Sequence, residues 1–143
     1  MLGKFRVWDK ENKNMRYPND YPFFIAGCGT LCVIGEDGSI HDMSQEYLYQ
    51  FFIGDQDVHN VDIYEGDFVC YDLYDDGKLI LQDPNPTLIE YAKKSCGCCN
   101  IVYGYNYDPT LLQRYKECPE IYEGLLPRVI GNIHENPELL KHA

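Results

Sequence analysis

Ile63-Tyr64-Glu65-Gly66-Asp67-Phe68-Val69 is the stretch that decides the fold predicted for this chain. One apolar run ends here, a Glu-Gly-Asp turn follows, and a second apolar run begins. A backbone that bends so tightly and then re-enters a sheet needs a residue without Cβ at the bend, and Gly66 provides it. We expect the Glu and Asp of the turn to be solvated and the flanking apolar residues to fill the core of a small barrel.

Short predicted strands separated by turn signals continue on both sides of this stretch. Asp37-Gly38 and Asp76-Gly77 each stand between two apolar runs, which is typical of a tight hairpin. Near the N-terminus, Phe5 and Val7 alternate with polar residues and should share one face of a first strand. Residues 44–52 fit a short helix or a strand, and their aromatic content favours the strand. The sequence therefore predicts a mainly β fold with one or two short helices.

The length and the apolar content limit the class of protein. A chain of 143 residues forms one domain or two small subdomains. No apolar run approaches the roughly 20 residues of a membrane-spanning helix. The N-terminus passes directly into charged sequence, without the apolar run of a signal peptide. We therefore expect a cytoplasmic protein that makes no membrane contact.

The charge is strongly negative and unevenly distributed. The net charge is -11, and no Lys or Arg occurs between Arg16 and Lys78. Nucleic-acid binding depends on Lys and Arg side chains that displace counterions from phosphates, so direct contact with nucleic acid is not expected. Two interpretations stay open: a soluble acidic surface, or an acidic face that docks onto a basic partner and imitates nucleic acid.

The seven cysteines form one suggestive cluster, at Cys96, Cys98 and Cys99. Without a secretion signal, reduced thiols are favoured over a disulfide framework. Together with Cys118, or with Cys28 and Cys32, the cluster is a weak candidate for a tetrahedral zinc site. Free thiols that pack as small apolar groups are the favoured interpretation, and a redox switch is a further one.

Signatures of catalysis and of other metals are weak. No nucleophile elbow or phosphate-binding glycine loop occurs, and the four histidines lie in turn-like or terminal contexts. The acidic groups in 55–62 and 72–76 lack the spacing and the final Glu of a calcium-binding EF-hand loop. We expect no catalytic residues, no metal and no cofactor, and interpret the acidic groups as turns.

Aromatic residues supply the remaining candidates for binding. The thirteen tyrosines include Tyr103, Tyr105 and Tyr107. Tyr offers a large contact area with one polar end, which suits interfaces and stacking on planar ligands, although tyrosines also cover barrel cores. With Arg114 and Arg128, these three tyrosines are the predicted residues for binding a ligand or partner.

Three stretches resemble the YopX family, small proteins of temperate phages and prophages of Gram-positive bacteria. They are the sequences at 4–10, KFRVWDK, at 57–69, ending in IYEGDFV, and at 129–140, VIGNIHENPELL. Asn60 stands where the family usually has Gly, and Asn also tolerates left-handed backbone. Residues 78–127 contain no recognisable motif. The residues that carry the resemblance are interpreted as structural: Ile63, Tyr64, Gly66, Asp67, Gly131, Asn136 and Pro137.

The resemblance implies an SH3-like barrel over residues 53–143, packed on a smaller N-terminal β subdomain over residues 1–52, unless both form one continuous domain. It implies no established activity. The leading hypothesis is a non-enzymatic phage or prophage accessory protein that binds a host or phage protein, or associates with itself as a homo-oligomer. The alternatives are a protein that sequesters a nucleotide signal of host defence, and a metal-dependent enzyme.

Overall fold

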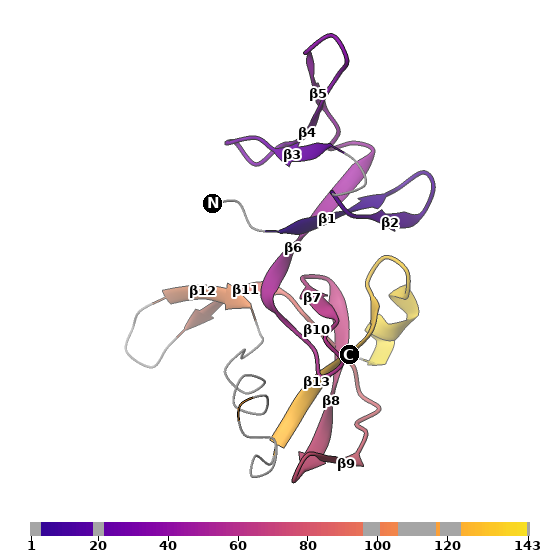
Figure 1. Cartoon of the computed structure of the whole chain (residues 1–143), viewed down its shortest axis with the longest axis vertical. Helices are drawn as coiled ribbons and strands as arrows, with labels where there is room; N and C mark the ends of the chain where they lie inside the picture. The colour runs from indigo at the N-terminus through magenta and orange to yellow at the C-terminus, as the bar shows by residue number, and fades with distance from the viewer. Residues whose placement is uncertain (1–3, 19–21, 96–100, 106–116, 118–123, 143) are drawn as a thin grey trace. The chain divides into compact units, whose positions relative to one another are not determined.

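The computed structural model describes residues 4–18, 22–95, 101–105, 117 and 124–142. Contacts divide the chain into two compact units, Met1–Phe52 and Ile53–Ala143, and each is described by itself. Strands make up most of the described elements, and a short 3₁₀ helix, η1 (Pro137–His142), lies near the C-terminus (Figure 1). The predicted mainly β fold with little helix is confirmed.

The first unit contains strands of two antiparallel sheets. One joins β1 to β2 and to the first part of β6, and the other is a meander of β3, β4 and β5. Their bounds are β1 (Phe5–Asp9), β2 (Asn14–Arg16), β3 (Phe23–Ile25), β4 (Leu31–Ile34), β5 (Ile40–Asp42) and β6 (Tyr47–Gln56). The strand expected within residues 44–52 is therefore present; it begins at Tyr47, after a turn, and ends at Gln56.

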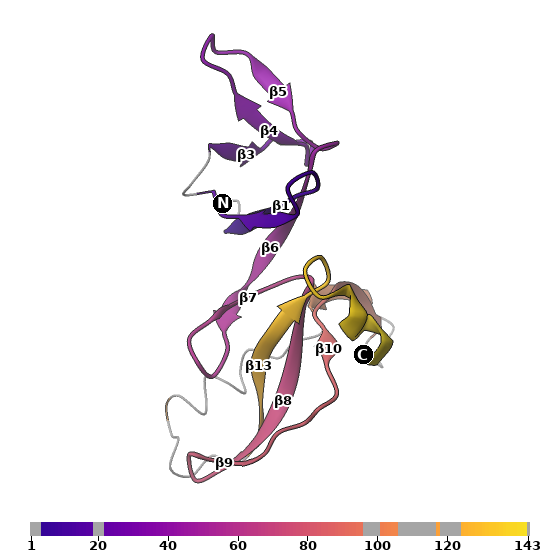
Figure 2. The same cartoon turned by 90° about the vertical axis from the view of Figure 1, so that its right-hand side faces the viewer.

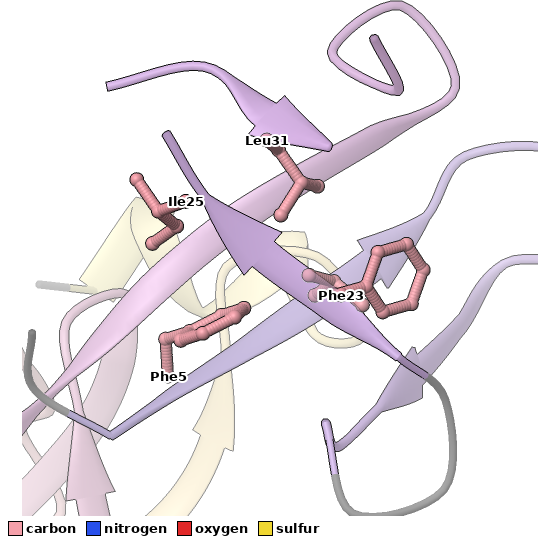
Figure 3. Close-up of a cluster of buried hydrophobic side chains, with 5 residues drawn as sticks. Phe5, Phe23, Ile25 and Leu31 are labelled. Atoms are coloured by element: carbon pink, nitrogen blue, oxygen red, sulfur yellow. The ribbon is translucent and has the colours of Figure 1, made fainter. Parts of the chain in front are cut away.

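The core of the first unit is built by alternation along these strands. Phe5 and Val7 of β1 are buried together with Phe23, Ile25 and Leu31 (Figure 3). Tyr47 and Tyr49 of β6 pack against this cluster, with the Tyr47 ring 4.9 Å from that of Phe23 in an edge-to-face arrangement. Because alternate aromatic residues of β6 reach one core, the segment is stable as a strand and not as a helix.

The turn between β1 and β2 depends on the carboxylate of Asp9. Oδ1 accepts hydrogen bonds from the backbone N–H groups of Glu11 and Asn12, at 3.1 and 3.0 Å, and Oδ2 accepts one from Asn12 Nδ2 at 2.8 Å. Arg16 Nε lies 3.4 Å from Oδ2. The hydrogen bonds from Asn12, aided by Arg16, lower the pKa of Asp9.

We expect Asp9 to make the first unit sensitive to acid. A carboxyl group whose pKa is lower in the folded state stabilises that state above its unfolded pKa, about 3.9, and loses this contribution as the pH falls through the folded value. Asp9→Asn should therefore lower Tm at pH 7 and have little effect near pH 2. Thermal unfolding followed by Trp8 fluorescence measures this, and an equal difference at both pH values would contradict it.

Both predicted Asp-Gly hairpins are present. β4 and β5 meet through a turn closed by a hydrogen bond from Gly38 N to Gly35 O. β8 (Asp67–Asp75) and β9 (Lys78–Leu81) meet through Asp76 and Gly77, with φ of 51° and 76°. Positive φ at both central residues is the type I′ geometry, for which Asp-Gly is favoured.

The second unit is organised around β8. One sheet has the order β10-β8-β13, and β9 pairs with the far end of β8 (Figures 1 and 2). The remaining strands are β7 (Asp62–Tyr64), β10 (Thr87–Leu88), β11 (Tyr91–Ser95), β12 (Ile101–Tyr105) and β13 (Gly124–Asn132); β11 and β12 form a separate hairpin. The sheet curls into an open half-barrel. Its specific assignment to the SH3-like class stays a prediction.

The turn that follows β7 is held from several directions. Gly66 has φ of 85°, its N–H donates to Ile89 O, and its carbonyl accepts from Ile133 N, both at 2.8 Å. Asp67 Oδ2 accepts from the Tyr64 N–H at 2.8 Å. The flanking Ile63 and Phe68 are fully buried, as predicted.

The expectation that Asp67 is solvated was wrong. Its side chain is almost completely buried, whereas Glu65 in the same turn is half-buried. The carboxylate accepts a hydrogen bond from the backbone N–H of Tyr64, a buried residue, and so provides an acceptor for a buried donor. Asp67 is therefore part of the turn's internal hydrogen bonding, and not one of its solvating groups.

Gly66→Val should reduce the free energy of unfolding by about 1–3 kcal/mol, because a β-branched residue is strained at φ of 85°. Gly66→Asn is the matched control. Asn60 already adopts φ of 64° in this chain, so the Asn variant should lose clearly less. Urea denaturation followed by circular dichroism measures both, and a fully stable Val variant would show that Gly66 is not required for the turn.

Candidate functional site

An apolar row crosses three strands of the second unit. In the strand register, Leu73 of β8 lies opposite Leu81 of β9 and also opposite Leu125 of β13. Residues opposite each other in neighbouring strands point to the same face of the sheet. The apolar row is therefore Leu81-Leu73-Leu125, and Tyr71, two residues before Leu73 on β8, lies on the same face.

The face that carries the apolar row packs in a buried core at one end of the sheet and lines a groove at the other. Val69 of β8 lies opposite Val129 and packs with Ile63 and Ile89 in a buried cluster, against which Tyr71 also packs. Leu73, four residues further along β8, is no longer part of this buried cluster. An open groove of about 320 Å³ is lined there by Tyr71, Leu73, Leu81, Gln82, Asp83, Pro84 and Leu125. At this end of the curled sheet, the apolar face therefore lines an open groove among the described residues.

The rim of the groove is apolar and exposed. Leu81 retains 63% and Leu125 51% of their possible exposure, and all of β9 is exposed. The register shifts between Leu73 and Tyr74 of β8, which makes Ile80 the additional residue of a bulge in β9. Such exposed apolar surface is typical of interaction sites in soluble proteins.

Among the described residues that line the groove, Asp83 is the charged one. Its Oδ1 accepts a hydrogen bond from Asn85 N at 2.9 Å, which holds the carboxylate in the segment that follows β9. Burial raises the pKa of Tyr71, so its hydroxyl stays neutral and available as a hydrogen-bonding group. Among the described residues, the lining therefore combines apolar surface with the carboxylate of Asp83, the amide of Gln82 and the phenol of Tyr71.

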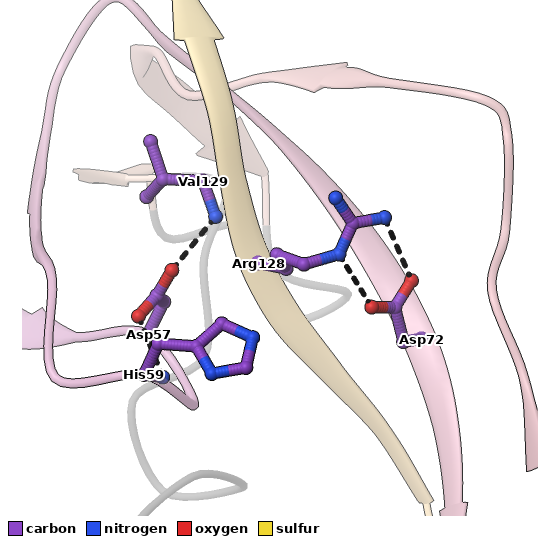
Figure 4. Close-up of polar contacts among 5 residues, drawn as sticks. All are labelled: Asp57, His59, Asp72, Arg128 and Val129. Atoms are coloured by element: carbon purple, nitrogen blue, oxygen red, sulfur yellow. Dashed lines mark hydrogen bonds and ion pairs between the residues drawn. The ribbon is translucent and has the colours of Figure 1, made fainter. Parts of the chain in front are cut away.

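On the other face of the same strands, Arg128 pairs with Asp72 (Figure 4). Arg128 Nε donates to Oδ2 at 2.7 Å and Nη2 to Oδ1 at 3.4 Å, and the Asp72 side chain is 0% exposed. The hydrogen bond to Asp72 raises the pKa of Arg128. Arg128 was predicted to bind a ligand or partner; the structure directs its guanidinium to Asp72, and its predicted role stays untested.

Asp57 lies on the opposite side of β13 from this pair (Figure 4). Oδ1 accepts from the backbone N–H groups of His59 and Val61, at 2.8 and 3.0 Å, and Oδ2 accepts from Val129 N at 2.9 Å. Asn60 has φ of 64°, so this Asn adopts the left-handed backbone expected of it. Both oxygens are used by the protein backbone, in agreement with the interpretation of this acidic segment as a turn.

A second polar array lies at the end of the β4–β5 hairpin. Ser39 Oγ donates to Asp37 Oδ1 at 2.5 Å, and it lies 2.9 Å from His41 Nε2. In a catalytic triad the serine is hydrogen-bonded to the histidine, which removes its proton, and the acid orients the histidine. Here the serine proton is directed to the acid instead. The hydrogen bond from Ser39 lowers the pKa of Asp37 and stabilises the turn.

The residues around η1 form a compact structural motif. Asn136 Oδ1 accepts from Asn132 N at 3.2 Å, and Asn132 Oδ1 accepts from the N–H groups of His134 and Glu135. A Cβ on Gly131 would lie 2.8 Å from Asn136 Cγ. Gly131 is therefore needed for close approach, and Asn136 and Pro137 begin the short helix, as their sequence indicated.

Several predicted site residues are placed only in part or not at all. In β12, Tyr103 lies opposite Lys93 and Tyr105 opposite Tyr91. Tyr107, Arg114, Cys96, Cys98 and Cys99 lie outside the described residues. Among the described cysteines, Cys28, Cys32 and Cys70 are free thiols, and burial raises the pKa of Cys70. The described part of the chain contains no group of three or more His, Cys, Asp or Glu arranged to hold a metal ion.

The predicted site did not include the groove. The sequence does contain one indication of it, because the run Leu79-Ile80-Leu81 departs from the alternation expected of a half-buried strand. No helix among the described residues is long and apolar enough to cross a membrane.

Comparison with known families gives a match over nearly the whole chain. The model of the family described as YopX protein matches residues 4–141. The chain belongs to the YopX family. The match includes residues 78–127, where the sequence alone offered no YopX motif. This YopX protein is also similar to a solved structure, the crystal structure of protein EF1440 from Enterococcus faecalis, with 26% identity, coverage of 98% of this chain and 99% of that one, and a TM-score of 0.48. No curated protein matches the YopX chain.

Proposed function

We propose that this YopX protein is a non-enzymatic module that acts by binding another protein. The observation that carries the proposal is the exposed apolar surface of the second unit, made of β9 and Leu125 around the groove. Apolar side chains that stay exposed beside a groove stabilise a complex when a partner covers them. The setting that we infer, from the family resemblance, is a phage or prophage protein that meets a host or phage partner in the bacterial cytoplasm.

The use of the acidic side chains supports binding over catalysis. Asp9, Asp57 and Asp67 accept backbone N–H groups, and Asp72 pairs with Arg128. General acid–base chemistry needs carboxyl groups directed to a substrate, whereas these four are directed to the protein's own backbone and side chains. Their arrangement is that of a rigid scaffold that presents a surface.

A small planar ligand is the second candidate, and the half-buried Tyr71 ring in the groove favours it. The groove volume of about 320 Å³ lies within the range of ligand pockets, roughly 300–1,000 Å³. The charge of the groove argues against a nucleotide signal, because the described residues that line it include Asp83 and no Lys or Arg that could pair with phosphate.

Cross-linking and sedimentation test the proposed function. The tagged protein is cross-linked in lysate of the bacterium that encodes it, the cross-linked peptides are identified, and the complex is rebuilt from purified components. We expect one defined protein complex, or a homo-oligomer in sedimentation velocity. A strictly monomeric protein with no reconstituted partner would contradict the proposal. Release of a small molecule from the purified protein, identified by mass spectrometry, would favour the second candidate.

A further inference from the structure

The groove continues the apolar face of a buried core, and this determines which kind of side chain can pack in it. The face that holds Val69 and Val129 in the buried cluster also holds Leu73 and Leu125. Neighbouring strands are spaced about 4.8 Å apart, so the three side chains of the apolar row form a short ridge across the sheet. What fits beside such a ridge is another apolar side chain, as in the closed end of the same sheet.

The charge around the groove distinguishes between possible occupants. Asp83 lines the groove, and Asp75 and Asp76 are exposed at the tip of the adjacent hairpin, where Lys78 is the basic neighbour. The chain as a whole carries -11. A second copy would bring the same negative charge to this face, while a basic segment would be attracted to it.

We propose that the groove binds an extended segment of a partner protein in which apolar residues alternate with Lys or Arg. In an extended segment, alternate side chains point to opposite sides. One set of side chains therefore packs on Leu81, Leu73 and Leu125, and the basic set lies on the outer side of the segment, where the negative charge around the groove attracts it. This inference rests on the proposed function and assigns its site and the chemistry of its partner.

Synthetic peptides of about ten residues test the inference directly. Three fluorescent peptides are compared by anisotropy: one alternates leucine with lysine, one leucine with glutamate, and one serine with lysine. We expect the leucine–lysine peptide to bind about tenfold more tightly than either of the others, since it alone supplies both apolar contact and positive charge. Its affinity should fall as salt is raised, because exposed charges are screened.

Variants of the protein locate the binding. Leu81→Ser and Leu125→Ser should each weaken the leucine–lysine peptide by about tenfold, and Asp83→Asn should weaken it and reduce the salt dependence. Leu140→Ser is the matched control, because Leu140 of η1 has the same 51% exposure as Leu125 but lies outside the groove. It should bind as the unsubstituted protein does, and circular dichroism should show that all four variants are folded.

Three results would overturn the inference. The first is that the leucine–lysine peptide does not bind, and the second is that it binds equally to all variants and to the unsubstituted protein. The third is that the protein forms a homo-oligomer that Leu81→Ser dissociates, because the occupant of the groove would then be a second copy of the chain. If the peptides do not bind but cross-links to a partner persist and map away from β9, the inference fails while the proposed function stands. If no partner and no oligomer exist, the proposed function itself fails.

Discussion

Arg128→Ala is expected to reduce the free energy of unfolding by about 3 kcal/mol, at the lower end of the roughly 3–5 kcal/mol measured when one partner of a buried ion pair is removed. The Asp72 carboxylate has 0% exposure, and Arg128 Nε donates to it at 2.7 Å. Without the guanidinium, this charge stays buried and uncompensated. We place the loss at the lower end because the Arg128 side chain is 26% exposed, so water can reach the site of the deletion.

A double variant separates the pair's net contribution from the penalty of the unpaired charge. Asp72→Leu/Arg128→Met removes both charges and keeps similar volume, and we expect it to recover most of the stability lost in Arg128→Ala. Urea denaturation monitored by far-UV circular dichroism measures all three proteins. If the double variant were as unstable as the single one, the loss would come from the favourable interaction between Arg128 and Asp72 itself instead of from the unpaired buried charge.

Local features of this fold were predictable because residue type alone restricts the backbone. Gly66 and Asp76-Gly77 adopt the positive φ that their turns require, and Asn60 does so where the family usually has Gly. The period of two in β1 predicted that Phe5 and Val7 share one face, and both side chains lie in the core cluster of the first unit. In each case the conformational preference depends on a few neighbouring residues, so a local sequence pattern can reveal it.

Contacts between distant segments were not predictable in this way. Arg128 and Asp72 are 56 residues apart, and Asp57 and Val129 are 72 apart. No local pattern shows which strand lies beside which, so the sequence did not indicate that Arg128 pairs with Asp72. The burial of Asp67 was missed for a related reason, since the sequence shows a charged turn residue but not the Tyr64 N–H that it satisfies.

The groove shows most clearly what strand patterns in a sequence cannot predict. Alternation predicts that Leu73 and Leu125 lie on one face, but the point at which cover ends depends on how far the sheet curls, and this is set by the whole unit. Strand patterns therefore reveal which side chains are apolar and which face they share. They do not reveal which of them stay exposed for a partner.

Asp57→Ala is the second change with a large expected effect, a loss of about 3 kcal/mol or more. The carboxylate is almost completely buried and accepts the backbone N–H groups of His59, Val61 and Val129. A buried donor that loses its acceptor costs about 1–3 kcal/mol, and here three donors lose theirs, although relaxation of the turn toward water recovers part. Hydrogen exchange should show the largest loss of protection at the Val129 amide, where the carboxylate joins the turn to β13.

Asp55→Ala is the matched control, because Asp55 is a half-buried carboxylate two residues away that accepts a hydrogen bond from the adjacent Gln56 N–H. We expect it to change stability by less than about 0.5 kcal/mol. The calcium interpretation of the same segment predicts the reverse pattern, in which added calcium raises Tm of the unsubstituted protein and both substitutions abolish that rise. Because both oxygens of Asp57 already accept backbone donors, we expect the same Tm with added calcium and with a chelator. A Tm that rises with calcium would contradict this and would mean that the Asp57 carboxylate binds the metal.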